Sequence, residues 1–171
     1  MNDVASRNTA ITAYSNGHPG NMTVSQYFAN LHNDATSSVS YTAKDCAGYL
    51  RDARGAGYSG STSNFCNDTA YFGYIELKND GTRNYDKLIP GMELHQACRK
   101  SADSNYYYSK HIGVYYGKYD FGDGVMRHAV YQSCSSNTNI KTLTNKSSGP
   151  NLTSMTDKWT YWAWSKYIRL G

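Results

Sequence analysis

The fold is decided by a ten-residue segment, Asp45–Arg54, whose sequence is DCAGYLRDAR. Asp45 is a good N-cap residue and Gly55 or Gly57 ends the segment, so the pattern predicts a helix between them. Cys46 would then be the first helical residue. Backbone amides at a helix N-terminus favour an anion, which stabilises a thiolate and lowers the pKa of the thiol. The segment therefore predicts both a helix and a candidate nucleophile at its start.

A second helix is predicted on the N-terminal side of this segment. Thr23 is placed to cap it, and its apolar residues recur at i, i+3, i+4 and i+7 as one stripe, namely Val24, Tyr27, Phe28 and Leu31. Residues 1–22 are polar and rich in turn formers, which predicts an N-terminal arm. A chain of 171 residues fits one domain. We therefore expect a single domain over residues 23–171.

From about residue 71 onward the sequence becomes typical of β-structure. Turn signals lie at residues 79–81, at Pro90-Gly91 and at Gly122–Gly124, whereas Ser147–Pro150 indicates a long surface loop. Helices followed by strands predict an α+β domain with an antiparallel sheet of about five or six strands. The predicted strands are Tyr71–Lys78, Met92–Ala97, His111–Tyr116, Gly124–Ser133, Thr138–Leu143 and Trp159–Arg169.

Composition and charge argue against several classes of protein. The net charge is +4, and no run of Lys or Arg exceeds two residues, which disfavours a dedicated nucleic-acid surface. No stretch approaches the roughly 20 apolar residues of a membrane span. Residues 1–11 lack the apolar core of a secretory signal. The 4 cysteines show no metal-type spacing, so we expect free thiols in a reducing cytoplasm.

A nucleophilic cysteine needs a base within hydrogen-bond reach and a group that orients the base. His111 opens the strand-like run HIGVYYG and would project from the end of the sheet, where a helix N-terminus can face it. His128 lies near the start of the next run, and the turn at Gly122–Gly124 can place it beside His111. Taken alone, a cysteine in a helix is usually a small buried apolar residue, and a histidine on a strand is more often a structural one.

Three segments, in this order, resemble signature blocks of the NlpC/P60 family, namely Asp45–Gly48, His111–Tyr115 and His128-Ala129. Members of this family are papain-like cysteine peptidases that cut the peptide stems of bacterial peptidoglycan. The segment Leu88–Met92 (LIPGM) is similar to the family's turn into the first core strand. The resemblance covers roughly residues 24–145. It implies a papain-like fold with N-terminal helices packed on the antiparallel sheet.

The resemblance assigns the catalytic roles. It implies that Cys46 is the nucleophile, that His111 is the general base, and that His128 is the third catalytic residue, which holds the imidazole in its useful tautomer. Backbone amides near Cys46 would bind the oxyanion. Neither a metal nor a cofactor is required.

The resemblance also implies three substrate-binding positions. Asp45 would help to hold the free amine of a stem peptide. Ala47 stands where the family has a serine that helps to bind substrate, so subsite preference is expected to differ. Tyr41 is the nearest substitute for an aromatic block that the family carries before the cysteine and that this sequence lacks.

The implied reaction is cleavage of the bond between D-Glu and the diamino acid of a stem peptide. One alternative is the amide that joins muramic acid to L-Ala, and another is an inactive wall-binding or virion module. An acyltransferase of the related permuted fold is disfavoured, because its histidine block precedes its cysteine block. We expect a monomeric phage lysin or its catalytic domain, with peptidoglycan as the partner rather than nucleic acid or membrane. It would be made in the host bacterial cytoplasm without a signal peptide and would act on the cell wall.

The aromatic run Trp159–Ile168 closes the sequence. As a strand it carries aromatic side chains on both faces, which predicts a strand buried between the sheet and the helices. The alternative is a sugar-stacking ledge at the rim of the cleft. Similar aromatic endings occur in wall-lytic enzymes of phages, which favours the lysin interpretation by association.

Overall fold

The computed structural model describes residues 22–54, 75–76, 85, 88–96, 99–100, 107–108, 111–163 and 168–169. Most of the predicted N-terminal arm and the predicted turn at residues 79–81 lie outside these ranges. So do Cys66 and Cys98. Met22, the last residue of that predicted arm, belongs to a short strand instead.

The first helix, α2 (Val24–Ala35), confirms the predicted helix and its cap. The Thr23 hydroxyl accepts a hydrogen bond from the Gln26 amide at 3.1 Å, and the Gln26 side chain accepts one from the Thr23 amide at 2.9 Å. This reciprocal capping box satisfies two backbone donors that the helix itself leaves without partners. The apolar stripe faces the core, where Tyr27, Leu31 and Ala35 are fully buried.

The second helix, α3 (Cys46–Arg54), confirms the helix predicted from the opening segment. The Asp45 carboxylate accepts a hydrogen bond from the Gly48 amide at 2.8 Å and so caps the helix. Cys46 is its first residue, as predicted. Arg51 and Arg54 lie in the last turn, where cations interact favourably with the helix dipole.

The described strands form a six-stranded sheet of order β2-β9-β3-β6-β7-β8, in which every neighbouring pair is antiparallel. The α+β class and the antiparallel sheet are therefore confirmed. Its members are β2 (Ile75–Glu76), β3 (Glu93–Gln96), β6 (His111–Asp120), β7 (Met126–Cys134), β8 (Gly149–Ser154) and β9 (Trp159–Ala163). Two small ribbons join β1 (Met22–Thr23) to β10 (Ile168–Arg169) and β4 (Arg99–Lys100) to β5 (Tyr107–Tyr108).

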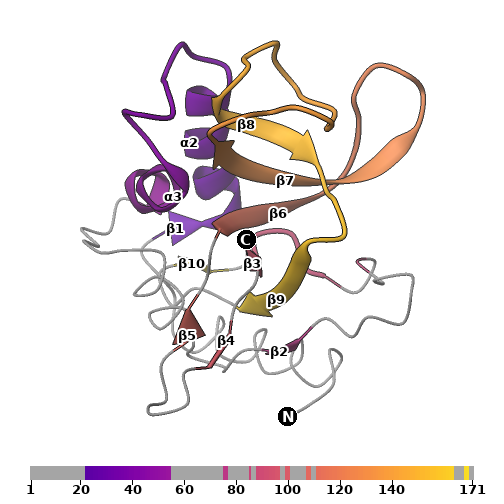
Figure 1. Cartoon of the computed structure of the whole chain (residues 1–171). Helices are drawn as coiled ribbons and strands as arrows, with labels where there is room; N and C mark the ends of the chain where they lie inside the picture. Colours follow the sequence, from indigo (N-terminus) through magenta and orange to yellow (C-terminus); the bar gives the residue numbers. More distant parts are fainter. Residues whose placement is uncertain are drawn as a thin grey trace.

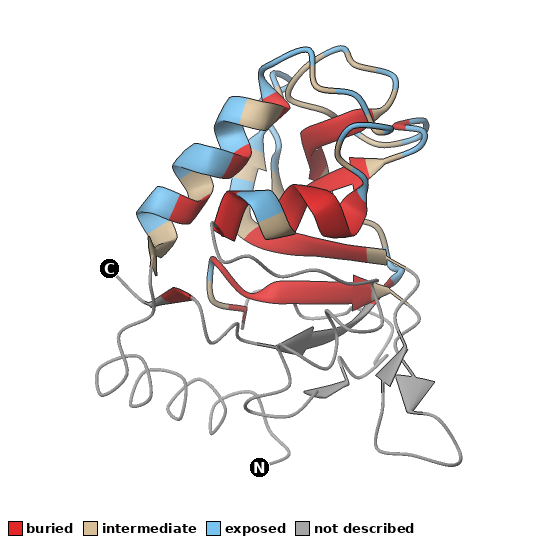
Figure 2. Ribbon diagram, turned by 90° about the vertical axis from the view of Figure 1, so that its left-hand side faces the viewer, coloured by how far each residue is buried: buried red, intermediate tan, exposed pale blue. Residues whose placement is uncertain are grey.

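The helices cover one face of this sheet. Helix α3 lies beside the start of β6 and the end of β7, and α2 lies along β7 and β8 (Figure 1). Buried residues are concentrated in α3 and in the strands beneath it (Figure 2). Because residues that are opposite one another on neighbouring strands share a face, Glu93 shares this covered face with Val114 and Tyr131.

Two sequence predictions about the strands are wrong. The predicted strand Thr138–Leu143 is irregular apart from a single bridge between Thr142 and Thr153. The predicted loop Ser147–Pro150 runs into β8, in which Gly149 and Pro150 are buried. Proline and glycine usually break strands, but β8 is at the edge of the described sheet, where a missing backbone donor is tolerated.

The hairpin that joins β6 and β7 turns at Gly122–Gly124, as predicted. Gly122 and Gly124 both have positive φ, and both of their amides donate to the Asp120 carboxylate. From this turn the register pairs Lys118 with His128, and a shift between Tyr115 and Gly117 displaces it by one residue. The hairpin thus sets which residues of β7 can meet the start of β6.

Acidification is expected to destabilise the protein through His95, which is fully buried. Burial lowers the pKa of His95 from 6.5 to about 3, and the charge of His111 acts in the same direction. The unfolded chain takes up a proton near pH 6.5 and the folded chain only near pH 3, so the free energy of unfolding falls as pH drops between these values. Each pKa unit corresponds to about 1.4 kcal/mol.

Urea unfolding of wild type and of His95→Gln at pH 7, pH 5 and pH 4 measures this effect. The wild type should lose stability more steeply than the variant as the pH falls, because glutamine does not titrate. Parallel pH dependences in the two proteins would show that His95 is not responsible.

Candidate active site

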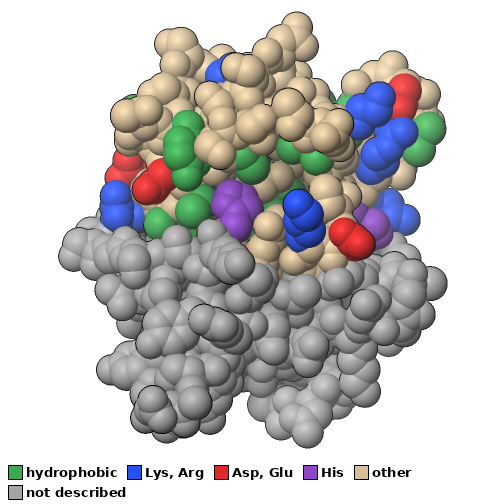
Figure 3. All heavy atoms as spheres, viewed as in Figure 1, with side chains coloured by type: hydrophobic (Ala, Val, Ile, Leu, Met, Phe, Trp, Pro, Cys, Tyr) green, Lys and Arg blue, Asp and Glu red, His purple; other side chains and the backbone are tan. Residues whose placement is uncertain are grey.

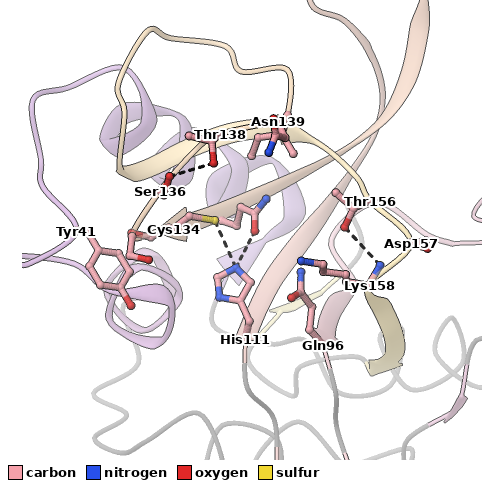
Figure 4. Close-up of a pocket in the computed structure, with 14 residues that line it drawn as sticks. Tyr41, Gln96, His111, Cys134, Ser136, Thr138, Asn139, Thr156, Asp157 and Lys158 are labelled. Atoms are coloured by element: carbon pink, nitrogen blue, oxygen red, sulfur yellow. Dashed lines mark hydrogen bonds between the residues drawn. The ribbon is translucent and has the colours of Figure 1, made fainter.

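An open pocket of about 680 Å³ lies at the end of the sheet where β6 begins and β7 ends (Figure 4). Hydroxyl and amide groups dominate its lining, so it suits a polar ligand with many hydrogen-bonding groups. The lining residues are Tyr41, Gln96, His111, Gln132, Ser133, Cys134, Ser135, Ser136, Thr138, Asn139, Ile140, Thr156, Asp157 and Lys158.

The side chain of His111 lies in this pocket and is held from two sides. Its Nε2 atom is 2.7 Å from Oε1 of Gln132. Its ring also packs on Trp159, with 5.5 Å between the ring centroids. Continuing the β6–β7 register places Gln132 opposite Gly113, so Gln132 and His111 project from the same face. Trp159 is fully buried in β9, which holds the first part of the predicted strand Trp159–Arg169, whereas Ile168–Arg169 forms β10 and pairs with β1 in a separate sheet.

A chain of hydrogen bonds sets the tautomer of His111. The Thr153 hydroxyl donates to the Ser154 carbonyl at 3.2 Å and accepts from Nε2 of Gln132 at 2.6 Å. The amide oxygen of Gln132 therefore faces His111. Because an amide oxygen only accepts, Nε2 of His111 must carry the proton. The neutral imidazole then has its basic nitrogen at Nδ1.

Cys134 is the thiol that lies next to this imidazole within the pocket. Its Sγ atom is 3.7 Å from Nε2 of His111, and the residue is a partly exposed free cysteine. Nε2 already holds a proton, so it cannot accept one from Cys134. In this tautomer the nitrogen that can accept a proton is Nδ1, on the other side of the ring from Cys134.

Cys46 is the first residue of α3, has 8% of its surface exposed and does not line the pocket. The segment that leads into it is tied to β7, because the Ser133 hydroxyl donates to the Lys44 carbonyl at 2.5 Å. Ser133 is the sequence neighbour of both Gln132 and Cys134. The helix start and the histidine are therefore brought to the same end of the sheet.

Tyr41, one of the three predicted substrate-binding residues, lines the pocket, and its binding role stays a prediction. Burial raises the pKa of Tyr41, and negative charge on Cys46, Asp45 and Cys134 acts in the same direction. Its hydroxyl is therefore within electrostatic reach of both thiols. Asp45 and Ala47 differ from Tyr41, since neither lines the pocket. Asp45 caps α3 and Ala47 is buried in it, so their binding roles stay predictions.

His128 is not beside His111, and that prediction is wrong. Nδ1 of His128 is 2.8 Å from the Tyr115 hydroxyl, and its ring contacts Tyr85. The predicted strands ended too early. Strand β6 runs on for 10 residues, so the residue of β7 nearest the turn pairs with the far end of β6 rather than with its start. When the pairing of β6 and β7 is counted outward from the turn over the full length of β6, residues 132–134 and not His128 come to lie beside His111.

Within the described ranges, no group of three or more His, Cys, Asp or Glu side chains is placed to hold a metal ion. No described helix is long and apolar enough to span a bilayer.

No protein-family model, curated protein or solved structure matches this chain.

Proposed function

We propose that this protein is a cysteine hydrolase that cleaves amide bonds, with Cys46 as nucleophile, His111 as base and Gln132 as the orienting residue. The observation that carries the proposal is the hydrogen-bond chain from the Ser154 carbonyl through Thr153 and Gln132 to His111. It presents the basic nitrogen of an imidazole in an open polar pocket. A histidine that served only the core would not need this exposure.

In the proposed reaction, Nδ1 of His111 takes the proton of the Cys46 thiol. The amide dipoles at the start of α3 stabilise the resulting thiolate. The thiolate attacks the substrate carbonyl carbon, and amides at the same helix end bind the oxyanion. The imidazolium then donates its Nδ1 proton to the leaving amine. Water attacks the thioester while Nδ1 accepts its proton, which releases the carboxylic acid and restores the thiol.

The proposed substrate is the stem peptide of bacterial peptidoglycan, cut between D-Glu and the diamino acid by a papain-like enzyme of the NlpC/P60 type. Three features support this assignment. A helix that begins with Cys46 precedes the strand that begins with His111, as in that family. The local sequences at both residues resemble the family's blocks. The hydroxyl- and amide-rich pocket fits a peptide with many donors and acceptors. A phage lysin that acts as a monomer on the cell wall is the corresponding biological role.

Digestion of purified peptidoglycan, with products identified by mass spectrometry, tests the function. New amino termini on the diamino acid are expected. Free L-Ala termini would instead assign the muramoyl-alanine amidase reaction on the same site. Binding to peptidoglycan without released products would contradict hydrolysis and support the inactive wall-binding module.

Gln132 is expected to control the rate through the tautomer of His111. Gln132→Leu removes the acceptor for Nε2–H, so kcat should fall by about 10- to 100-fold. This is smaller than the whole contribution of a positioned proton-transfer group, which is roughly 10²- to 10⁴-fold. Gln132→Glu keeps an acceptor and adds a negative charge. It should retain more activity and move the acidic limb of the pH–rate profile to higher pH, because the carboxylate favours the imidazolium.

Thr153→Val is the matched control for this relay, because it removes only the hydroxyl that holds the Gln132 amide. It should lower kcat by less than Gln132→Leu does. Steady-state rates over pH 4–9, with circular dichroism to confirm folding, measure all three variants. Equal pH profiles for Gln132→Glu and wild type would contradict the orienting role.

A further inference from the structure

Among the described lining residues of the pocket, Lys158 is the only lysine or arginine. Its side chain reaches into the pocket beside Gln96, on the side of His111, whereas Asp157 lies at the outer side (Figure 4). No described carboxylate lies within ion-pair distance of its ammonium. Elsewhere on this face, basic side chains are interspersed with acidic ones rather than gathered into a patch (Figure 3).

The backbone at Lys158 is held close to His111. Lys158 directly precedes Trp159, the fully buried residue whose ring packs on the imidazole. The turn before it is held by two hydrogen bonds. The Lys158 amide donates to the Thr156 hydroxyl at 3.4 Å, and the Thr156 carbonyl accepts from the Tyr85 hydroxyl at 2.9 Å. The exposed Lys158 side chain therefore starts from an anchored backbone at the pocket.

We propose that Lys158 binds a carboxylate of the substrate and makes the enzyme selective for acidic peptides. This inference rests on the proposed function. The hydroxyl and amide groups of the lining bond well to peptide groups, but they do not compensate a full negative charge. An ammonium does so through charge-assisted hydrogen bonds. In a stem peptide the suitable group is the free α-carboxylate of the γ-linked D-Glu, which adjoins the bond to be cut. Amidation of that carboxylate removes its charge.

Two matched peptides test the selectivity. L-Ala-γ-D-Glu linked to a diamino acid carries the carboxylate, and its D-isoglutamine counterpart carries an amide. Wild type should cleave the acidic peptide with a kcat/KM about 10-fold or more above that for the amidated one, as expected for a hydrogen bond to a charged group. Lys158→Met should lose this preference, because kcat/KM should fall for the acidic peptide and stay unchanged for the amidated one. Lys158→Arg should keep most of it.

Lys141→Met is the control for a general change in charge, since Lys141 is an exposed lysine outside the pocket lining. It should leave the preference for the acidic peptide unchanged. A loss in Lys141→Met equal to that in Lys158→Met would show that overall charge, not the pocket, sets the selectivity.

Calorimetric binding of the same peptides to Cys46→Ala separates this inference from the proposed reaction. The acidic peptide should bind more tightly than the amidated one, and Cys46→Ala/Lys158→Met should bind both equally. If this pattern holds while wild type cleaves neither peptide, the carboxylate site stands and hydrolysis is wrong. If Lys158→Met leaves the preference intact, or if Cys46→Ala binds neither peptide, the carboxylate site is overturned.

Discussion

Cys46→Ala is expected to abolish peptidoglycan hydrolysis, whereas Cys134→Ala is expected to preserve it. Proximity alone favours Cys134, whose Sγ atom lies 3.7 Å from Nε2 of His111 in the pocket, whereas Cys46 is buried at the start of α3 and does not line the pocket. The tautomer argues for Cys46 instead, because Nε2 of His111 donates to Gln132 and faces Cys134, which leaves Nδ1 as the base in the proposed reaction. Loss of a covalent nucleophile lowers kcat by about 10³-fold or more.

Release of soluble stem fragments, measured by mass spectrometry at equal protein concentration, provides the comparison. Both variants should unfold at temperatures close to that of wild type, since alanine replaces a small side chain in each. Activity that survives in Cys46→Ala and disappears in Cys134→Ala would reverse the assignment of the nucleophile.

Arg54→Met is expected to lower the free energy of unfolding by about 3–5 kcal/mol, the cost of leaving a buried charge without its partner. Arg54 and Glu93 are completely buried, and their closest charged atoms are 3.6 Å apart. Nearby, the pKa of Tyr27 is raised well above its usual value, first by burial and then by the charge of Glu93. Methionine fills much of the volume of arginine, but it cannot compensate the carboxylate.

The double variant Arg54→Met/Glu93→Gln is the matched control, because it removes both charges at once. Replacing both members of a buried ion pair is far less damaging than removing one. Urea unfolding should therefore place the double variant between Arg54→Met and wild type. A double variant less stable than Arg54→Met would contradict the ion-pair explanation.

The helices were predictable because their signals are local. Thr23 with Gln26 forms a capping box within four residues, and Asp45 caps α3 through Gly48, three residues away. The turn at Gly122–Gly124 was predictable for the same reason, since glycines supply the positive φ that it needs.

The edge strand β8 was not predictable from local pattern. Its glycine and proline indicate a loop, and only its pairing with β7 makes it a strand. The opposite error occurred at Thr138–Leu143, where β-branched residues indicated a strand. Several of its polar groups bond instead to the neighbouring β8 segment, as the Lys141 amide does to the Ser154 hydroxyl. Strand formation in both places depends on partners distant in sequence.

The two principal residues of the proposed site could be named from sequence because each begins an element, Cys46 a helix and His111 a strand. Gln132 could not, because its role depends on the register of β6 and β7, including the shift near Gly117. Lys158 could not be proposed from the sequence either. It immediately precedes the aromatic strand and carries no pattern of its own, and only the packing of Trp159 on His111 brings it to the pocket.

The claim that His111 activates Cys46 is tested most directly by the pH dependence of iodoacetamide alkylation, read separately at Cys46 and Cys134 by peptide mapping. The proposed mechanism predicts that Cys46 reacts faster than Cys134 and does so well below pH ~8.5, the pKa of a free cysteine. His111→Ala should remove this reactivity at low pH. Faster alkylation of Cys134, or a Cys46 rate that His111→Ala leaves unchanged, would contradict the assignment.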